Sequence, residues 1–375
     1  MRLAILSTIE GAAWGGTEEV WVQLARLALE RGHEVMAAVD HRIAAAPPVQ
    51  ALAPLGLRLT RRRPWRPQRL YLLKESLWPE HRALAAFRPD LLVINAGSVL
   101  DPLQLPHLRR LCRALAVPQV LFCHFHSDLL AVPQRQLLRE FLASMRHLVF
   151  VAEGNLHDLE RTIAGPLPPS SVIPNQSRTR LSAPLPWPKA PPLRLACVAR
   201  FEVLWKGQDL LLEALACPEL LARPWQLDFY GSGRDERYLE ELIHHFGLQE
   251  RIQVKGFEPD LARIWNDHHL LALPSRGEGM PLVALEALMH GRPVLATAVG
   301  GVGEVVRDGQ EGYIAESATV ACLRRTLRRA FTDAASWPAL GMEGHCRAKG
   351  FAAIDPPEKL LNLLASLSIS RKTKS

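Results

Sequence analysis

Residues 271–314 read LALPSRGEGMPLVALEALMHGRPVLATAVGGVGEVVRDGQEGYI, and this stretch decides both the fold and the chemistry expected of the chain. Two carboxylates stand eight positions apart within it. Glu278 lies in a Gly-rich loop that follows an apolar strand, and Glu286 lies in the helix that comes next. Pro281 suits the first turn of that helix, because the backbone N–H that proline lacks would have no partner there.

The first turn of this helix is suited to bind an anion. The N–H groups beside Gly279, Met280 and Leu282 have no carbonyl partner inside the helix, so they can face a phosphate-like group. A carboxylate next to that anion would repel it, and we therefore expect Glu278 and Glu286 to point at hydroxyl groups. An anion site beside two hydroxyl-binding carboxylates indicates a site for a sugar nucleotide.

Length and composition indicate a globular protein of two domains. The 375 residues exceed one ordinary core, and the hydrophobic content of 48% and charged content of 22% are those of soluble proteins. No apolar run reaches the ~20 residues that cross a bilayer. The apolar part of the N-terminus is too short for a signal peptide, and Glu10 interrupts it. We therefore expect a cytoplasmic protein.

The six cysteines show neither a disulfide framework nor a zinc site. They are scattered without CxxC or histidine spacing, and most stand among apolar neighbours, as small core residues do. We expect reduced, structural thiols at Cys112, Cys123, Cys197, Cys217, Cys322 and Cys346.

The net charge of +7 and the pI near 9.3 call for an anionic partner or surface. Arginine is densest in residues 57–73, LRLTRRRPWRPQRLYLL, where six arginines surround Trp65. Such a segment can serve lipid head groups, lipid-linked pyrophosphates or nucleic acid, and a solvated loop is the plain alternative. We expect an anionic membrane surface and no nucleic acid, because no helix-turn-helix, RNP or zinc-finger pattern accompanies the charge. The arginines are Arg58, Arg61, Arg62, Arg63, Arg66 and Arg69.

The first half of the chain alternates apolar runs with amphipathic segments. A helix is expected over residues 17–31, with Val20, Leu24 and Leu27 on one face and Gly32 as its stop. Strands that read as continuous apolar runs between helices indicate a parallel sheet covered on both faces. The expected strands are residues 3–7, 34–39, 91–95, 119–124 and 148–152.

A proline-dense stretch divides the chain. Residues 166–192 disfavour helix interiors and central strands, and one short strand is expected at 171–173. The alternation of strands and helices then restarts, which predicts two stacked α/β domains whose ligands bind beyond the carboxyl ends of the strands, facing an interdomain cleft. The expected parts are an acceptor-binding domain over 1–175, a linker over 176–192, a nucleotide-sugar-binding domain over 193–350, and a C-terminal helix with a basic tail over 351–375.

Four pieces of the sequence together resemble the retaining glycosyltransferases of family 4, which have the two-domain GT-B fold. The resemblance spans most of the chain and is densest from residue 195 to 314. Its pieces are EGMPLVALE at 278–286, RFEVLWKG at 200–207, FYGSG at 229–233, and VIPN at 172–175 with a WGGTEE loop near the N-terminus.

This resemblance implies roles for particular residues. Arg200 and Lys206 would contact the donor diphosphate, Glu286 the ribose hydroxyls and Glu278 the donor sugar near its transferred end. The alternatives are two surface cations after a strand and a carboxylate that caps the helix. Donor-binding positions also include Gly231 and the N–H groups of Gly279, Met280 and Leu282.

A departing nucleoside diphosphate develops negative charge, which enzymes stabilise with a metal or with fixed cations. No Asp-x-Asp pair stands near the motifs, so we expect no metal and no cofactor, with the helix N-terminus and the cations Arg200 and Lys206 in place of an ion. The resemblance further implies retention of configuration by front-face attack, without a covalent nucleophile.

The first domain should hold the acceptor. Gly15 and Gly16, with Gly11, form a loop after the first strand where backbone can approach a phosphate or an acceptor, and the loop is not the GxGxxG of dinucleotide sites. The resemblance also implies a histidine near the donor sugar, for which His124 fits better than His126. Glu202 and Asp128 stay unassigned.

The expected function is hexosyl transfer from a UDP- or GDP-linked sugar to a lipid-linked or polysaccharide acceptor in the synthesis of cell-surface glycans such as lipopolysaccharide. The expected place of this reaction is the cytoplasmic side of the membrane, with the protein bound peripherally. Two alternatives stay open, namely a nucleotide-sugar epimerase of the same fold and a basic membrane- or nucleic-acid-binding protein without catalysis.

Overall fold

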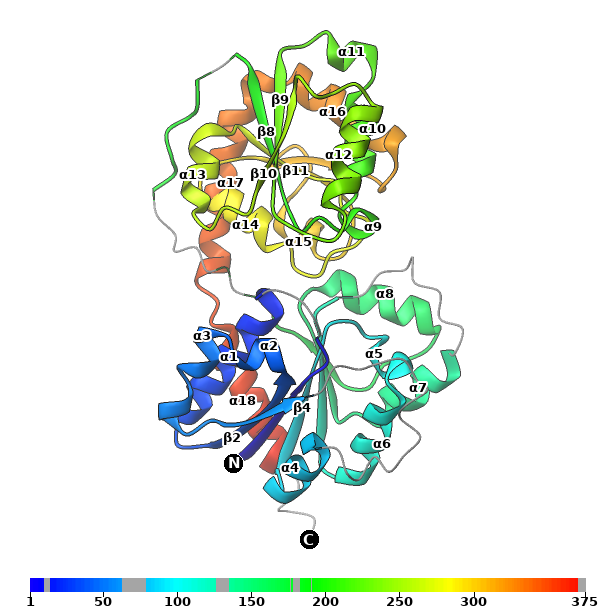
Figure 1. Ribbon diagram of the computed structural model, residues 1–375, viewed down its shortest axis with the longest axis vertical. Coiled ribbons are helices and arrows are strands. Elements are labelled where there is room, and N and C mark those ends of the chain that lie inside the picture. Colours follow the sequence, from blue (N-terminus) through cyan, green and yellow to red (C-terminus); the bar gives the residue numbers. More distant parts are fainter. Residues whose placement is uncertain are drawn as a thin grey trace. The chain divides into compact units, whose positions relative to one another are not determined.

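The computed structural model of the protein describes residues 1–9, 14–62, 79–125, 135–175, 177, 183–189 and 191–369. It divides into two compact units, Met1–Gln176 with Asp355–Ser375, and Ser177–Ile354. Each unit is a parallel sheet with helices on its faces (Figure 1). The two Rossmann-like units confirm the predicted fold class of two parallel-sheet domains.

The first unit holds a seven-stranded sheet in the order β3-β2-β1-β4-β5-β6-β7. All its pairs are parallel, with Leu3 beside both Val35 and Leu91. Its strands are β1 (Arg2–Ser7), β2 (Glu34–Asp40), β3 (Arg58–Arg62), β4 (Leu91–Ala96), β5 (Gln119–Cys123), β6 (His147–Phe150) and β7 (Ser170–Val172). Its helices are α1 (Gly16–Glu30), α2 (His41–Ala44), α3 (Pro47–Gln50), η1 (Ala53–Leu55), α4 (Pro79–Phe87), α5 (Asp101–Gln104), α6 (Pro106–Leu115), α7 (Arg135–Ala143), α8 (Glu153–Ile163) and α18 (Pro356–Ile369).

The second unit holds a six-stranded parallel sheet in the order β10-β9-β8-β11-β12-β13. Its strands are β8 (Leu193–Val198), β9 (Trp225–Tyr230), β10 (Ile252–Gly256), β11 (Leu270–Leu273), β12 (Val294–Thr297) and β13 (Gly312–Ala315). Its helices are α9 (Val203–Lys206), α10 (Gln208–Leu215), α11 (Pro218–Leu221), α12 (Glu236–His245), α13 (Leu261–Asp267), α14 (Leu282–Met289), α15 (Val302–Val305), α16 (Val320–Thr332), η4 (Ala334–Ser336) and α17 (Trp337–Ala352).

The strand order determines where a ligand site is expected in each unit. Strand order reverses between β1 and β4 in the first sheet and between β8 and β11 in the second. Loops that leave neighbouring strands in opposite directions open a crevice at their carboxyl ends, and ligands of such sheets bind there. In the second unit that point is flanked by the loops after β8 and after β11.

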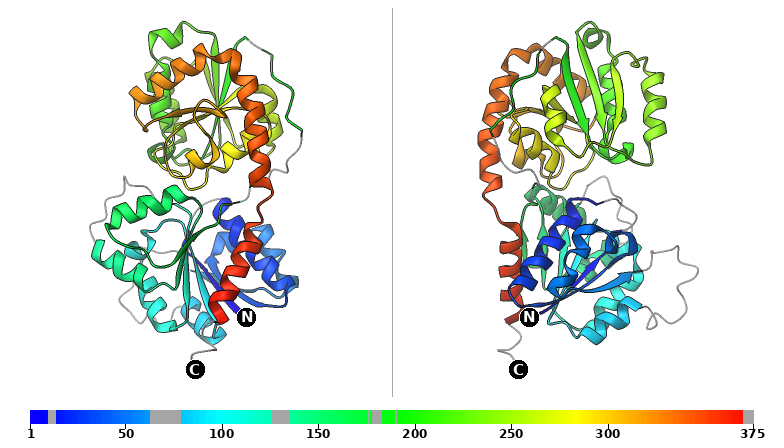
Figure 2. Two further views of the ribbon diagram at one scale, coloured as in Figure 1. Left: turned by 180° about the vertical axis from the view of Figure 1, so that it is seen from behind. Right: turned by 60° about the vertical axis from the view of Figure 1, so that its left-hand side comes forward.

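The C-terminal helix α18 belongs to the first unit. It packs against α1, and the two helices run side by side in both views of Figure 2. Leu360, Leu361 and Leu364 are buried in this contact region, and Arg31 binds Glu358 through two parallel hydrogen bonds of 2.9 and 2.6 Å. The first fold unit is therefore built from both ends of the chain.

The sequence pattern does not predict β3, because its residues RLTRR read as part of a basic loop. It pairs in parallel with β2 at the edge of the sheet. The interpretation as a solvated or membrane-facing segment is wrong for Arg62, which is 1% exposed. Its guanidinium donates to the carbonyl oxygens of Ser7, Thr8 and Ile9 at 3.1, 3.3 and 3.0 Å. Arg63, Arg66 and Arg69 lie outside the described residues.

Each unit has its own hydrophobic core. In the first, apolar side chains of β4, β5 and β6 pack under α4, α6 and α7, and in the second Trp225, Trp337 and their neighbours fill the space between sheet and helices. Continuous burial along the central strands is what a sheet covered on both faces requires. All six cysteines are free thiols, and four of them are buried. Over the described part of the chain, no helix has the length and apolarity needed to span a membrane.

Candidate functional site

The loops after β8 and β11 bring Lys206 and Glu278 into contact. Lys206 is the last residue of α9, and its Nζ lies 2.7 Å from Oε1 of Glu278. Both side chains are largely buried, with 18% and 10% of their surfaces exposed. The sequence predicts both residues at one site with separate ligands, and it does not predict their direct ion pair.

A hydroxyl group supports the same carboxylate oxygen. Ser275 Oγ donates to Oε1 of Glu278 at 2.6 Å, and the Ser275 carbonyl accepts from Thr297 Oγ1 at 2.5 Å. Thr297 is the last residue of β12, so three neighbouring strand ends contribute to this network. A buried carboxylate that accepts from an ammonium and a hydroxyl is held in one orientation.

Two glycines let backbone segments approach the pair closely. Gly207 follows Lys206 with φ of +64°, and a Cβ there would lie 2.0 Å from the Pro274 carbonyl oxygen. Gly300 has φ of +51°, and a Cβ there would lie 1.9 Å from the Glu278 carbonyl oxygen. No other residue type fits either position, because the left-handed backbone and the missing Cβ are both required.

The helix after Glu278 begins one residue later than the sequence predicts. Pro281 is the N-cap and α14 runs from Leu282, so Pro281 is not in the first turn. Within the described residues, the N–H groups of Gly279, Met280 and Leu282 donate none of the hydrogen bonds found. The loop is fixed instead by the Gly279 carbonyl, which accepts from the Gly301 N–H at 2.9 Å. These unused donors make the N-terminus of α14 available to an anion.

Glu286 and Arg200 lie in more open surroundings. Glu286 is partly exposed on α14, and its Oε1 accepts from Ser177 Oγ at 3.3 Å. Arg200 follows β8, with 62% of its side chain exposed, and pairs with Glu202 at 3.2 Å. Arg200 is thus tethered to a carboxylate while most of its guanidinium faces water.

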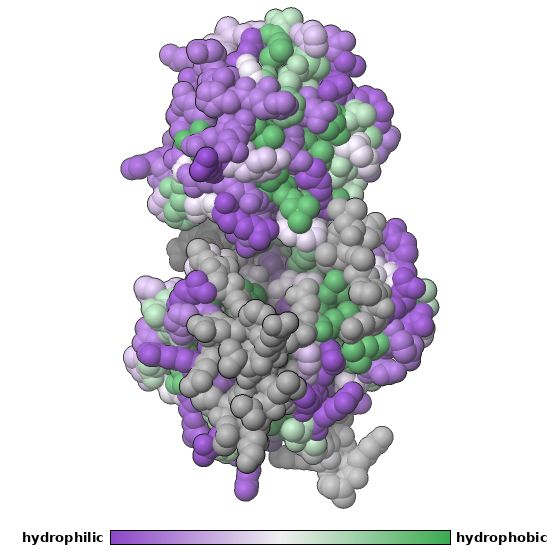
Figure 3. Space-filling model, turned by 45° about the vertical axis from the view of Figure 1, so that its right-hand side comes forward, coloured by the Kyte–Doolittle hydropathy of each residue, from purple (hydrophilic) through white to green (hydrophobic). Residues whose placement is uncertain are grey.

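Gly231 and Gly233 close the loop after β9. A Cβ at Gly231 would lie 1.9 Å from the Ala199 carbonyl oxygen, and one at Gly233 would lie 2.3 Å from that of Phe201. The loop therefore packs directly on the segment that carries Arg200. Exposed hydrophobic groups also stand at this end of the sheet, since Leu204 in α9 is 59% exposed and Phe257 after β10 is 75% exposed. On the face drawn in Figure 3, hydrophobic residues of the second unit form separate patches in a mainly hydrophilic surface.

In the first unit, His124 follows β5 and is 6% exposed. Its Nε2 lies 2.8 Å from Oδ1 of Asn95, whose Nδ2 lies 3.5 Å from the Thr17 carbonyl oxygen. That contact orients the amide with its oxygen toward the histidine, so Nε2 carries the proton. Burial lowers the pKa of His124 to about 3. Its Nδ1 is a buried acceptor without a partner among the described residues.

A partly buried carboxylate, Asp101, lies at the switch point of the first sheet, and the sequence pattern does not predict it. Thr8 after β1 donates its hydroxyl to Asp101 Oδ2, and the Ser98 N–H donates to the same oxygen at 3.3 Å. Burial raises the pKa of Asp101, while these hydrogen bonds and the charge of Arg62 oppose the shift. Asp101 stands 93 residues from Thr8, and no local pattern signals such a contact.

The other predicted residues of the first unit lie at the start of α1. Gly15 is the N-cap with extended backbone, and its carbonyl accepts from the Glu19 N–H at 3.1 Å. Gly16 is the first residue of the helix. Gly11, His126 and Asp128 lie outside the described residues.

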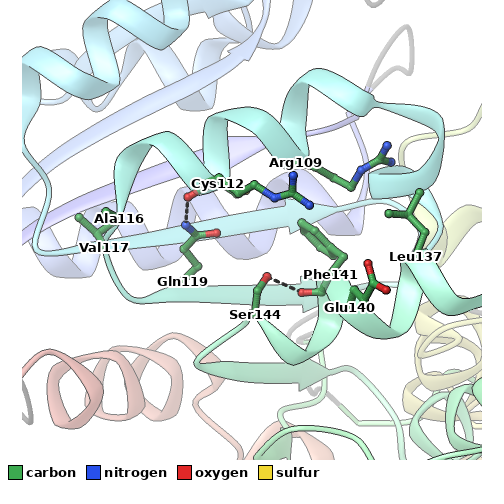
Figure 4. A pocket seen from close by; sticks show the side chains of 10 residues that line it. Arg109, Cys112, Ala116, Val117, Gln119, Leu137, Glu140, Phe141 and Ser144 are labelled. Carbon is green, nitrogen blue, oxygen red and sulfur yellow. Dashed lines mark hydrogen bonds between the residues drawn. The ribbon is translucent and has the colours of Figure 1, made fainter.

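A cavity of about 250 Å³ lies elsewhere in the first unit, between α6 and α7. Figure 4 shows the Gln119 amide donating to the Cys112 carbonyl and the Ser144 hydroxyl donating to that of Phe141. None of the predicted site residues lines it. Among the described residues, no three His, Cys, Asp or Glu side chains gather as a metal ion would need.

Two protein-family models match this chain, one in each unit. Residues 192–333 match the model described as glycosyl transferases group 1, and residues 14–176 match the model described as glycosyltransferase family 4. The chain belongs to the family 4 and group 1 glycosyltransferases. The first model includes Lys206 and Glu278, and the second covers most of the first unit, including His124.

Relatives of this glycosyltransferase align over part of its length. One is D-inositol 3-phosphate glycosyltransferase 1 of Catenulispora acidiphila, 33% identical over 172 residues, which are 43% of this chain and 41% of that protein. Another is the exopolysaccharide phosphotransferase SCO2592 of Streptomyces coelicolor, 32% identical over 131 residues, 34% of this chain and 14% of that protein. The chain thus spans less than half the length of these curated relatives.

Solved structures of similar fold cover nearly the whole glycosyltransferase. Sucrose-phosphate synthase from Thermosynechococcus elongatus has a TM-score of 0.74 at 20% identity, with 100% of both chains covered. Anabaena HepE in complex with UDP and glucose has a TM-score of 0.73 at 18% identity, covering 98% of this chain and 100% of its own. The lipopolysaccharide outer core galactosyltransferase WaaB scores 0.69 at 16% identity, covering 98% and 99%. At these identities the likeness shows the fold, which is GT-B.

Proposed function

We propose that the protein transfers a hexosyl unit from a nucleotide-diphosphate sugar to a lipid-linked or polysaccharide acceptor, with retention of configuration. The observation that carries this proposal is the Lys206–Glu278 pair at the switch point of the second sheet, beside the unused N–H groups at the start of α14. The combination offers positive charge to a diphosphate and a carboxylate to a sugar within one group of loops.

The leaving diphosphate is stabilised in this proposal by three fixed positive groups. Lys206 has three N–H donors, and only one is needed for Glu278, so the others can face phosphate oxygens. Arg200, with its guanidinium mostly in water, and the N-terminus of α14 add charge from two sides. Groups held in place before the reaction stabilise developing charge without reorganisation. The reaction then needs no metal ion and no cofactor beyond the nucleotide sugar.

The two glutamates bind hydroxyl groups in this proposal. Glu286, partly exposed on α14 with Ser177 as a neighbour, accepts from the vicinal ribose hydroxyls. Glu278 accepts from the donor sugar, and its contacts with Lys206 and Ser275 fix its direction. The ammonium of Lys206 offsets part of the repulsion between the Glu278 carboxylate and a nearby diphosphate, which weakens the electrostatic objection to placing Glu278 there.

His124 supplies a hydroxyl acceptor from the first unit. Its Nδ1 atom is buried and carries a lone pair that accepts from no group among the described residues. Burial lowers the pKa of His124 to about 3, so the ring is uncharged at neutral pH. A sugar hydroxyl donated to Nδ1 satisfies that atom. The loop at Gly15 and Gly16 is proposed to hold the acceptor. Attack then proceeds from the face that the diphosphate leaves, and a phosphate oxygen accepts the acceptor's proton.

Two similar proteins and the exposed arginines of β3 support the proposed acceptor class and location. WaaB is a lipopolysaccharide outer core galactosyltransferase, and the Streptomyces relative is an exopolysaccharide phosphotransferase. Arg58 and Arg61 on β3 are exposed. A basic edge can bind the anionic inner face of a membrane at about 1 kcal/mol per arginine. The protein then works peripherally on the cytoplasmic side.

A thermal-shift panel of UDP, GDP, ADP and their sugars tests the proposal. A ligand that binds only the folded protein raises its melting temperature by mass action. We expect one nucleoside diphosphate and its sugar to raise it in a saturable way, with UDP the first to examine. If none of these ligands shifts the melting temperature, the proposal is wrong.

A further inference from the structure

We propose that Arg276 and Asp209 are positioning residues that set the geometry of the Lys206–Glu278 pair. This inference rests on the proposed function, because it gives the two residues a purpose in donor binding. Arg276 stands two residues before Glu278, and Asp209 stands three residues after Lys206.

The two residues form a bidentate ion pair. Arg276 Nη1 lies 2.8 Å from Asp209 Oδ1, and Nη2 lies 2.6 Å from Oδ2. The side chains are 21% and 29% exposed, so water screens the pair only in part. Two parallel hydrogen bonds fix the planes of both groups, which a single lysine contact cannot do. The pair therefore holds α10 at a defined place relative to the loop after β11.

Arg276 also holds the short helix that carries Lys206. Its Nη1 donates to the Val203 carbonyl at 3.1 Å, and its backbone N–H donates to the Trp205 carbonyl at 2.8 Å. Val203 and Trp205 lie in α9, whose four residues end at Lys206. A helix this short has no independent stability, so its position depends on tertiary contacts. Arg276 supplies two of them.

The same junction is closed by backbone packing. Gly207 joins α9 to α10, and its Cα lies so close to the Pro274 carbonyl that a Cβ would approach that oxygen to 2.0 Å. Pro274 and Arg276 belong to the loop that continues to Glu278. The two loops are thus tied at Gly207 and at Arg276, on either side of the residues that form the site. Loss of the Arg276 side chain removes its contacts with Asp209 and with the Val203 carbonyl. The backbone hydrogen bond to Trp205 and the close approach at Gly207 remain, and they hold α9 less firmly, so Lys206 shifts.

The effect on ligand binding follows from this geometry. A displacement of about 1 Å at a reacting group costs on the order of a hundredfold in rate. We expect Arg276→Gln to weaken UDP binding by about tenfold or more, because the ammonium no longer stands beside both Glu278 and the diphosphate. Arg276→Lys keeps the charge but loses the fork, so we expect an intermediate loss.

The second unit offers a control pair of the same chemistry. Arg329 in α16 binds Asp308 in a bidentate arrangement that includes an Nη1–Oδ2 distance of 2.9 Å. This pair joins elements that carry none of the proposed donor-binding residues. Arg329→Gln removes a comparable ion pair, so it reports the general cost of losing one.

The experiment measures UDP affinity by titration calorimetry and the melting temperature for wild type, Arg276→Gln, Arg276→Lys, Asp209→Asn and Arg329→Gln. We expect weaker affinity in the first three variants and wild-type affinity in Arg329→Gln. In a Lys206→Met background, Arg276→Gln should add little, because it acts through that lysine. Asp209→Asn carries the test if Arg276→Gln does not fold.

Two results would overturn the inference. One is wild-type UDP affinity in the folded Arg276 and Asp209 variants, and the other is an equal loss in these variants and in Arg329→Gln. Both leave the proposed function standing. Failure of the wild-type protein to bind any nucleoside diphosphate removes the proposed function itself, and with it the role assigned to Arg276.

Discussion

The ammonium of Lys206 lies 2.7 Å from Oε1 of Glu278, and the two side chains come from the loops after β8 and β11, where the strand order reverses. With 18% and 10% of the two side chains exposed, the pair differs from a surface salt bridge. Removal of either partner leaves a mostly buried charge with less compensation. Substitution of either residue should therefore affect stability as well as ligand binding, and each variant needs a melting temperature beside its activity.

Lys206→Met should reduce kcat/KM by roughly a hundredfold or more, because the loss of one charge-stabilising donor costs about 3 kcal/mol in the transition state. Steady-state assays with the donor found in the panel measure this. Lys255→Met is the control, since Lys255 is exposed in the same unit and bonds only to Gln253 among the contacts found in the described residues. Equal activity in the two variants would remove Lys206 from the diphosphate site.

Gly300→Ala should lower donor affinity, because the added Cβ would lie 1.9 Å from the Glu278 carbonyl oxygen on a left-handed backbone. The segment that carries Glu278 must then move. Gly303→Ala is the matched control three residues away, where a Cβ meets nothing within 4 Å. Calorimetry with the nucleoside diphosphate compares the two. Wild-type affinity in Gly300→Ala would show that the loop tolerates displacement.

His124 should make stability fall in weak acid. Its folded pKa is about 3 and its ordinary value is 6.5, so between these values only the unfolded chain takes up the proton. The stabilisation is complete above pH 6.5 and is lost as pH falls toward 3. Between pH 7.5 and 5, wild type should lose about 2 kcal/mol more than His124→Gln, measured by urea unfolding. Parallel losses in both proteins would contradict the buried, neutral ring.

Arg62→Met should destabilise the first unit by about 1–3 kcal/mol, because the Ser7 and Ile9 carbonyls lose a charged donor in a buried place. Arg61→Met, on the exposed side of the same strand, should leave stability nearly unchanged. Urea unfolding measures both. An equal, small effect would mean that water can replace the Arg62 guanidinium.

Membrane binding is tested at Arg61 rather than at Arg62. Arg61→Glu should weaken binding to anionic vesicles while the fold stays intact, since this side chain is exposed. A co-sedimentation assay at low salt measures it, with neutral vesicles as the control. Unchanged binding to anionic vesicles would show that Arg61 on β3 does not bind the membrane.

The central strands were predictable from sequence because both of their faces are buried. The apolar runs predicted as strands at 3–7, 34–39 and 91–95 correspond to β1, β2 and β4. β3 escaped notice because three of its five residues are arginine, and its place in the sheet depends on pairing with β2. A hydropathy pattern does not indicate that the Arg62 guanidinium is buried and donates to backbone carbonyl groups.

The candidate site was predictable in its residues and not in their contacts. The motif around Glu278 and the cations after β8 could be read locally, and the turn before α14 was misplaced by one residue. The Arg276–Asp209 pair spans 67 residues of sequence and the Thr8–Asp101 pair spans 93. Such pairs form only when parallel strands bring their carboxyl ends together, so the periodicity of the sequence cannot predict them.

The most direct test of the central claim is titration calorimetry of UDP, and of GDP if UDP does not bind, in the presence of EDTA. Wild-type protein should bind one nucleoside diphosphate at a single saturable site with affinity unchanged by the chelator, and Lys206→Met should bind it far more weakly. Binding that requires added magnesium, or that is the same in Lys206→Met, would contradict a diphosphate site built from fixed positive groups of the second unit.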